Sequence, residues 1–255
     1  RWTVRPSGPL RGAPTIAFGN LYLMGQDNQL FALRTGDGGV EWQESGSVAP
    51  GSVFGVAAPA AGQGTIVAGY SSGELNAYRY ENGRPLWADA LARTSISVAV
   101  STLADIDADP VIDRGRVFAI GQGGRMAAYE LVTGQRTWEL NLAGIATPWV
   151  AGEWVFVVAD DARVFAIARA TGRIRWIAQL PRWRDEEDRE GAIRWTGPVL
   201  AGDRLILVST DGRMAQVSPL DGSVSSIAPI SGGTRLPPIV ANGMLYVMDD
   251  SGRIT

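Results

Sequence analysis

Six prolines divide the chain into equivalent segments, and this repeat constrains the fold more than any other sequence feature. The prolines are Pro14, Pro59, Pro110, Pro148, Pro198 and Pro238. An apolar residue follows each proline by sixteen positions, and a glycine follows each of the first five by twenty-four. Tryptophan follows the first four by twenty-eight positions, and Ser226 takes that place after the fifth. Length varies only between this position and the next proline, where the successive separations are 17, 23, 10, 22 and 12 residues. This pattern indicates rigid units joined by variable loops.

Each unit contains four short β-rich runs separated by turn residues. In the segment from Pro110, the runs are "PVI", "RVFAI" and "RMAAYEL", followed by a fourth that carries Trp138. The pairs Asp37-Gly38, Asn82-Gly83 and Asp221-Gly222 precede the fourth run, and such pairs are strong hairpin signals because tight turns need positive φ. Four antiparallel strands in a unit of 38 to 51 residues are typical of a β-propeller blade. The predicted fold class is therefore all-β.

A blade is too thin to bury its own faces, so each must pack against its neighbours. We expect the recurrent tryptophan to be a structural wedge, with the glycine four positions earlier allowing another backbone to approach. Trp2 lies twelve residues before Pro14, so it is predicted to end an earlier blade. One incomplete propeller domain over residues 1–255 follows from this pattern. Its predicted blades cover 14–45, 59–90, 110–142, 148–180 and 198–228, with partial blades at 1–5 and 238–255.

Composition excludes several kinds of function. The chain has no cysteine and no histidine, which removes thiolate zinc sites, cysteine nucleophiles and the commonest general base. The net charge of −3 gives no indication of nucleic-acid binding, and no apolar run approaches membrane-spanning length. No nucleophile motif such as Gly-x-Ser-x-Gly is present. We therefore expect a protein that is not an enzyme and needs no cofactor or metal.

Two sequence patterns resemble known propellers. The endings "VTGQRTW" and "ATGRIRW" are similar to the repeats of pyrroloquinoline-quinone (PQQ) dehydrogenases and their non-enzymatic relatives. The stretch "LADIDADPVIDRGRVFAIGQGGRMAAYELVTGQRTWELNLAG" resembles the BamB family, the lipoprotein scaffold of the outer-membrane β-barrel assembly machinery. That resemblance implies an eight-bladed propeller on the periplasmic face of the outer membrane, held by an N-terminal lipidated cysteine, a residue type that the printed sequence does not contain. The alternatives are a PQQ-dependent dehydrogenase or another PQQ-like periplasmic binding propeller.

The resemblance to the BamB family also implies a partner and a site. In that family, a periplasmic domain of the barrel-insertion subunit BamA binds inter-blade loops through an acidic pair and an apolar-Arg pair. Asp105 and Asp107 match the acidic pair. Val53 and Phe54 stand at the second place and retain only its apolar character, whereas a literal Leu10-Arg11 occurs one blade earlier. Other assembly subunits and nascent outer-membrane proteins are further candidate partners.

The aspartates of "DIDADPVID" do not form one predicted site. An EF-hand loop would require glycine at Pro110 and glutamate at Arg116, so a calcium site is not expected. Asp109 and Asp113 are predicted to be local hydrogen-bonding turn residues. Asp105 and Asp107 belong to a long connection and are expected to face outward, where they suit an arginine or lysine of another protein. A simply solvated acidic loop is the alternative.

A second charged segment, "LPRWRDEEDREGAIRW" at 180–195, mixes four arginines with five carboxylates. Such runs are commonly solvated and self-paired. Trp183 and Trp195 flank the charges outside the repeat phase, and exposed aromatics there would form a second interaction surface.

Overall fold

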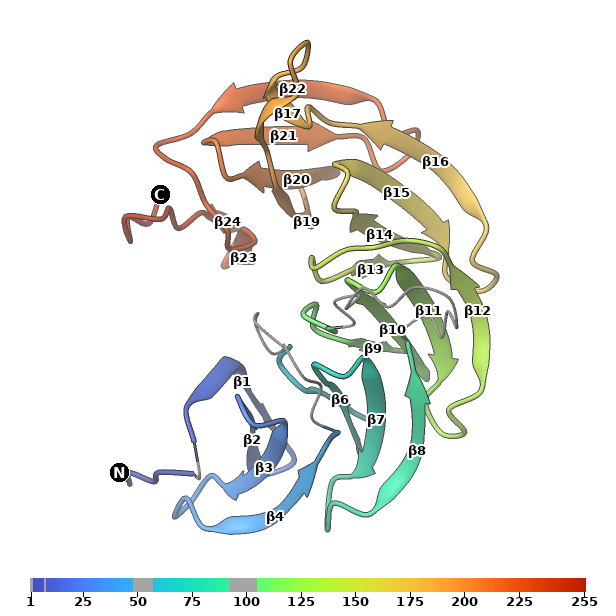
Figure 1. Ribbon diagram of the computed structural model, residues 1–255, viewed down its shortest axis with the longest axis vertical. Coiled ribbons are helices and arrows are strands. Elements are labelled where there is room, and N and C mark those ends of the chain that lie inside the picture. The colour runs from blue at the N-terminus through green and yellow to red at the C-terminus, as the bar shows by residue number, and fades with distance from the viewer. Residues whose placement is uncertain (1, 7, 48–56, 92–104) are drawn as a thin grey trace. The chain divides into compact units, whose positions relative to one another are not determined.

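The computed structural model describes residues 2–6, 8–47, 57–91 and 105–255 (Figure 1). The chain forms two compact units, Arg1–Ile145 and Ala146–Thr255. The described residues are all-β, and none of them forms a helix that is long and apolar enough to cross a membrane. The predicted four-stranded antiparallel sheets, with strands in chain order, are confirmed.

The first unit holds three such sheets (Figure 1). The first sheet is β1 (Leu10–Ala17), β2 (Asn20–Gly25), β3 (Gln29–Arg34) and β4 (Val40–Ser45). The second sheet is β5 (Ala60–Gly62), β6 (Thr65–Gly69), β7 (Glu74–Arg79) and β8 (Pro85–Ala90). The third sheet is β9 (Val111–Asp113), β10 (Arg116–Gly121), β11 (Arg125–Glu130) and β12 (Arg136–Leu140). β5 contacts both β1 and β9, so the first strands of successive sheets lie together.

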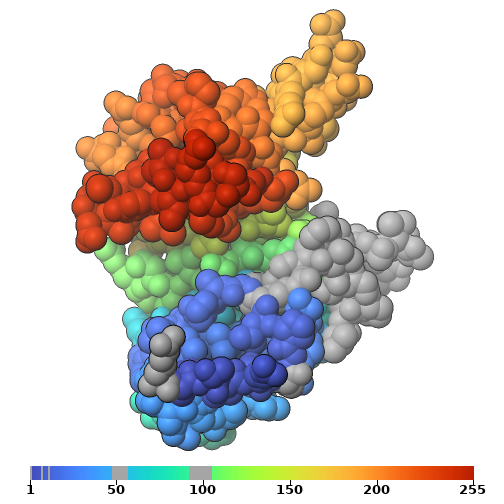
Figure 2. Space-filling view, turned by 90° about the vertical axis from the view of Figure 1, so that its left-hand side faces the viewer, coloured from blue at the N-terminus to red at the C-terminus, as the bar shows by residue number. Residues whose placement is uncertain are grey.

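The second unit continues the pattern with two full sheets. The fourth sheet is β13 (Trp149–Ala151), β14 (Trp154–Val158), β15 (Arg163–Ala168) and β16 (Ile174–Gln179). The fifth sheet is β19 (Trp195–Ala201), β20 (Arg204–Ser209), β21 (Arg213–Val217) and β22 (Val224–Pro229). A pair, β23 (Ile239–Ala241) and β24 (Met244–Tyr246), follows the fifth sheet. In the sequence, a hairpin of β17 (Trp183–Asp185) and β18 (Glu190–Ala192) lies between the two full sheets. It projects from the second unit (Figure 2).

The second and third strands of each sheet form the core because both of their faces are covered. All five residues of β6 are buried, for example, and its sequence is a nearly continuous apolar run. Ile66 joins the cluster toward the first sheet, whereas Val67 joins the cluster toward the third. Alternate side chains therefore serve two different interfaces, as the period of a strand requires.

Within each unit, the recurrent tryptophan joins one sheet to the next, which confirms its structural role. Trp42 of β4 lies on Gly83 in the β7–β8 turn, where an added Cβ would come within 2.8 Å of the ring. Its indole N–H donates to the Tyr80 carbonyl at 2.8 Å. Matching pairs recur within the units: Trp2 with Gly38, Trp87 with Gly134, and Trp176 with Gly222. The repeated glycine thus makes room for the ring of the preceding sheet.

Candidate functional site

The acidic segment Asp105–Asp109 leads into β9 and runs along the β10–β11 turn of the same sheet. The Gln122 backbone N–H donates to the Asp105 carbonyl at 2.9 Å. The Gln122 side-chain amide donates to Asp107 Oδ2 at 2.6 Å. On the other side, the Ile106 N–H donates to the Tyr70 carbonyl of the second sheet at 3.3 Å. The segment is therefore attached to two neighbouring sheets.

Asp105 does not face outward as predicted. Its side chain is only 2% exposed, and its Oδ2 has no hydrogen-bond partner among the described residues. The next residue, Ile106, is 1% exposed and fills space beside Gly69, where an added Cβ would lie 2.5 Å from Ile106 Cγ2. Because Ile106 packs into the core, the backbone before it is drawn against the sheets. Burial raises the pKa of the Asp105 carboxyl above its ordinary value.

The other aspartates have different surroundings. Asp107 is partly exposed, and the Gln122 amide orients its carboxylate. Asp109 Oδ1 accepts from the Ala58 N–H at 2.7 Å, so it connects the approach to the third sheet with the start of the second. The prediction of a local turn role for Asp109 is wrong, since this bond spans 51 positions of the chain. Asp113 ends β9 opposite Arg116, at the β9–β10 turn.

The position of Asp107 has counterparts in other sheets that sequence reasoning missed. The Gln26 N–H donates to the Pro9 carbonyl at 2.9 Å, the same pairing that Gln122 makes with Asp105. Arg11 lies three positions before Pro14, as Asp107 lies three positions before Pro110. Arg11 therefore occupies the place of Asp107 in the first sheet. In the second unit that place belongs to Arg235, which forms an ion pair with Asp250 at 2.5 Å. Val53 and Phe54 lie outside the described residues.

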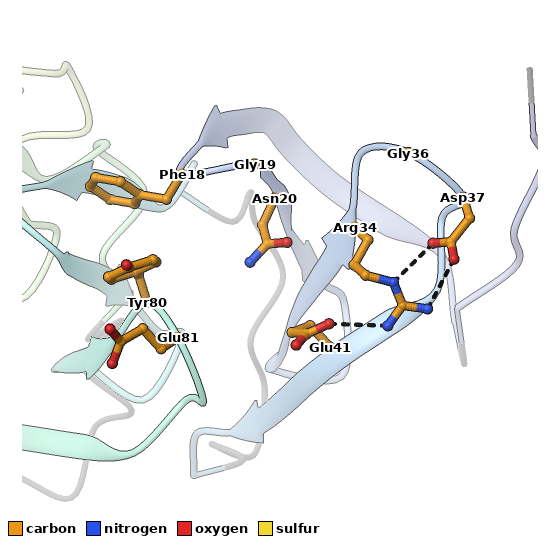
Figure 3. Close-up of a pocket in the computed structure, with 9 residues that line it drawn as sticks. All are labelled: Phe18, Gly19, Asn20, Arg34, Gly36, Asp37, Glu41, Tyr80 and Glu81. Atoms are coloured by element: carbon orange, nitrogen blue, oxygen red, sulfur yellow. Dashed lines mark hydrogen bonds and ion pairs between the residues drawn. The ribbon is translucent and has the colours of Figure 1, made fainter.

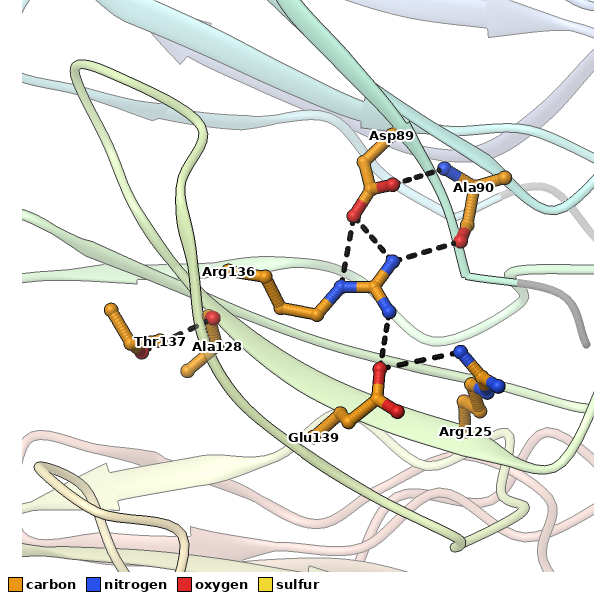
Figure 4. Close-up of polar contacts among 7 residues, drawn as sticks. All are labelled: Asp89, Ala90, Arg125, Ala128, Arg136, Thr137 and Glu139. Atoms are coloured by element: carbon orange, nitrogen blue, oxygen red, sulfur yellow. Dashed lines mark hydrogen bonds and ion pairs between the residues drawn. The ribbon is translucent and has the colours of Figure 1, made fainter.

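The described residues that precede the 92–104 connection are held by the third sheet (Figure 4). Arg136 of β12 donates to Asp89 Oδ2 of β8 from its Nε at 3.0 Å, and to the Ala90 carbonyl at 3.1 Å. It also forms an ion pair with Glu139. The guanidinium lies over the Tyr129 ring, 5.7 Å from its centroid. With Gln122 holding Asp105 and Asp107, both sides of the connection are fixed on folded strands.

The charged segment at 180–195 forms the β17–β18 hairpin. No ion pair joins its arginines to its carboxylates among the described residues, so self-pairing is not observed. The Glu186 carboxylate accepts from two backbone N–H groups instead, and Asp185 and Glu190 stand opposite each other across the strands. Trp195 is buried and donates to the Pro181 carbonyl at 2.8 Å, so the prediction that it is an exposed aromatic is wrong.

No group of three or more aspartates and glutamates that could hold a metal ion occurs in the described part of the chain. Asp107 and Asp109 bind different partners, the Gln122 amide and the Ala58 N–H. The segment presents one partly exposed residue, Asp107, whose carboxylate is oriented through Oδ2 and buried at Oδ1. Such a group suits a cation on another molecule.

The burial of Asp105 should make the free energy of unfolding depend on pH. A carboxyl whose folded pKa is raised stabilises the fold less as the pH rises from its ordinary pKa through the raised value. We expect Asp105→Asn to increase the free energy of unfolding at pH 7 by about 1 kcal/mol, because it removes an unpaired buried charge. At a pH below the ordinary carboxyl pKa the gain should disappear, since the native side chain is then neutral too. Urea unfolding at both pH values measures this, and Asp107→Asn is the control. An equal gain at both pH values would contradict the account.

The chain matches known proteins over most of its length. The family model described as "Outer membrane protein assembly factor BamB" matches residues 1–178. The BamB proteins of Shigella dysenteriae serotype 1 and Escherichia coli strain K12 are each 26% identical to this chain. Each match covers 99% of this chain and 73% of the relative. The crystal structure of BamB from Moraxella catarrhalis is similar with a TM-score of 0.86 at 23% identity, covering 100% of this chain and 74% of that one. A europium-containing methanol dehydrogenase is similar with a TM-score of 0.64 at 18% identity, covering 88% and 52%.

Proposed function

Because the chain belongs to the family of the outer membrane protein assembly factor BamB, we propose that it is a non-catalytic scaffold for outer-membrane protein assembly. Its place of action is the periplasmic face of the outer membrane. The match of the family model to residues 1–178 is the observation that carries this proposal. The same membership supports an eight-bladed propeller and a lipid anchor in the full-length protein. The likeness to a methanol dehydrogenase concerns the fold alone, so it supports no catalytic role.

The proposed partner is the periplasmic domain of a BamA-like barrel-insertion subunit, bound by the inter-blade loops. Asp107 is the proposed contact because the residue is partly exposed and its Oδ2 is oriented by Gln122, while Oδ1 is buried. An oriented carboxylate loses little side-chain entropy when it accepts hydrogen bonds from a partner's guanidinium or ammonium. Asp105 serves by holding the segment on the sheet through its carbonyl. Val53 and Phe54 stay a prediction for the apolar part of the contact.

Site-specific crosslinking tests this proposal, because a chain without cysteine can carry one at any chosen place. Gly123→Cys puts a thiol in the β10–β11 turn beside Gln122 and leaves Asp107 unchanged. Asp113→Cys, at the opposite end of β9, is the matched control. With a benzophenone-maleimide on the thiol, we expect the purified periplasmic domain to crosslink from position 123 and not from position 113. Equal yields from the two positions, or none from 123, would overturn the assignment.

A further inference from the structure

An open cavity of about 540 Å³ lies between the first and second sheets (Figure 3). We call it the rim pocket. The residues that line it include Phe18, Asn20, Arg34, Glu41, Tyr80 and Glu81. Phe18 comes from the β1–β2 turn, and Tyr80 and Glu81 come from the β7–β8 turn. In antiparallel sheets these turns lie at the end opposite to the inter-sheet connections. The rim pocket is therefore separate from the Asp107 segment.

Phe18 is an unexpected residue for its position. Its φ of 51° lies in the left-handed region, which is unfavourable for a bulky side chain, and the side chain is 44% exposed. The corresponding turns of other sheets carry Gln63, Arg114 and Asn242 with similar φ values of 49°, 45° and 53°. The fold therefore does not require an aromatic residue there. A strained, exposed aromatic side chain that the fold does not need indicates a binding role.

The aromatic side of the rim pocket is preformed. The rings of Phe18 and Tyr80 lie with centroids 4.7 Å apart at 42°. The backbone of Tyr80 is fixed because its carbonyl accepts from the Trp42 indole. Figure 3 shows this pair facing a second wall formed by Arg34 and Glu41, with the Asn20 amide between the two walls. Phe18 is 44% exposed and Tyr80 is partly exposed, so the pair offers aromatic surface to a flat or cationic group.

The floor of the rim pocket is polar and buried. Asn20 lines the cavity and is 8% exposed. Its side-chain amide carries both donors and an acceptor, so it can recognise a polar group of a ligand.

The charges of the lining favour a cation. Three carboxylates line the cavity, from Asp37, Glu41 and Glu81, against the single guanidinium of Arg34. Arg34 is already occupied, at 3.1 Å from Asp37 and 3.0 Å from Glu41. Its proximity lowers the pKa of Asp37, so that carboxylate stays ionised. The lining carries a net charge of −2 (one positive and three negative groups), and of −1 when Arg79, which lies 3.8 Å from Glu81, is counted, so an anionic ligand is disfavoured.

We propose that the rim pocket binds the arginine side chain of an extended polypeptide. A guanidinium is planar, so it can lie on the Tyr80 ring while it donates to the Glu81 carboxylate, which a compact ammonium cannot do as well. The cavity has the size of ordinary small-ligand sites and is open at the surface, which leaves room for the peptide on either side of the arginine. This inference does not rest on the proposed partner of Asp107.

An NMR titration with the tripeptide acetyl-Gly-Arg-Gly-amide tests this inference. We expect saturable shifts at Phe18, Asn20 and Tyr80, and at least tenfold weaker binding of the neutral citrulline analogue. Phe18→Asn should weaken binding about tenfold and keep the fold, because asparagine accepts positive φ and stands at the same place as Asn242. Gln63→Asn, in the equivalent turn of the second sheet, is the matched control and should change nothing.

A second variant blocks the cavity without touching its charges or rings. Gly36 lines the cavity, and an added Cβ there would meet no atom within 4 Å. Leu220 stands at the same place of the fifth sheet, so Gly36→Leu should fold and abolish binding. Asp107→Arg should leave peptide binding unchanged, which separates this site from the proposed partner site. Unaltered binding by folded Phe18→Asn and Gly36→Leu, equal binding of the citrulline peptide, or no binding by the native chain would each overturn the proposal.

Discussion

Replacing Trp42 with alanine should lower the free energy of unfolding of the first unit by about 3–5 kcal/mol. Trp42 is 7% exposed and lies between the first two sheets, with ring centroids 5.7 Å from Tyr22 and 6.2 Å from Tyr78. Its loss leaves a cavity and also removes the donor to the Tyr80 carbonyl. Both effects act on the packing of one sheet against the next. Urea unfolding followed by circular dichroism measures the change.

Two further variants separate these contributions. Trp42→Phe keeps most of the buried ring and loses the 2.8 Å hydrogen bond, so a smaller loss of about 1–2 kcal/mol is expected. Val132→Ala, at a residue that is 77% exposed, should change stability by less than about 0.5 kcal/mol. If Trp42→Ala cost no more than Val132→Ala, the tryptophan would not hold the sheets together.

Reversing the charge at Asp107 should weaken binding of the barrel-insertion subunit's periplasmic domain by roughly 30-fold or more, or about 2 kcal/mol. Asp107→Arg replaces an oriented acceptor with a cation that would repel the proposed basic partner group. The residue is partly exposed but its Oδ1 is buried, so circular dichroism of the variant serves as the control for its fold. Isothermal titration calorimetry measures the affinity.

Asp113→Arg is the matched control for this charge reversal, because it makes the same change in net charge at the other end of β9. Its affinity should stay within about twofold of the native value. The variant has the same net charge as Asp107→Arg, but the change lies away from the proposed contact. An equal loss in both variants would show that overall charge, rather than the Asp107 segment, governs association.

Sequence reasoning predicted the sheets because each unit is rigid between its proline and its tryptophan. The fixed spacing from the proline placed Trp42 within the repeated unit rather than in a loop, and its structural role was predicted from that. It did not identify the ring of the preceding sheet as the neighbour of the repeated glycine. Trp42 and Gly83 are far apart in the sequence, and only the packing of complete sheets brings them together.

The candidate site was less predictable, because the burial of a connecting segment depends on what packs beneath it. The apolar Ile106 between Asp105 and Asp107 was the available signal that the segment packs against the sheets. Simple alternation would turn both aspartates outward, whereas Asp105 is buried with Ile106. The space that Ile106 fills exists because Gly69 and Gly121 have no side chains, which no local pattern reveals. Phe18 carried a similar signal, as an aromatic residue in a turn position that is polar in neighbouring sheets.

The most direct test of the scaffold proposal is a calorimetric titration of the native chain with the periplasmic domain of the barrel-insertion subunit. We expect saturable binding of one domain per chain, weaker at higher salt because an ion pair contributes. The binding should be strongly reduced by Asp107→Arg but not by Asp113→Arg. A folded native chain that binds no partner domain under these conditions would contradict the scaffold proposal.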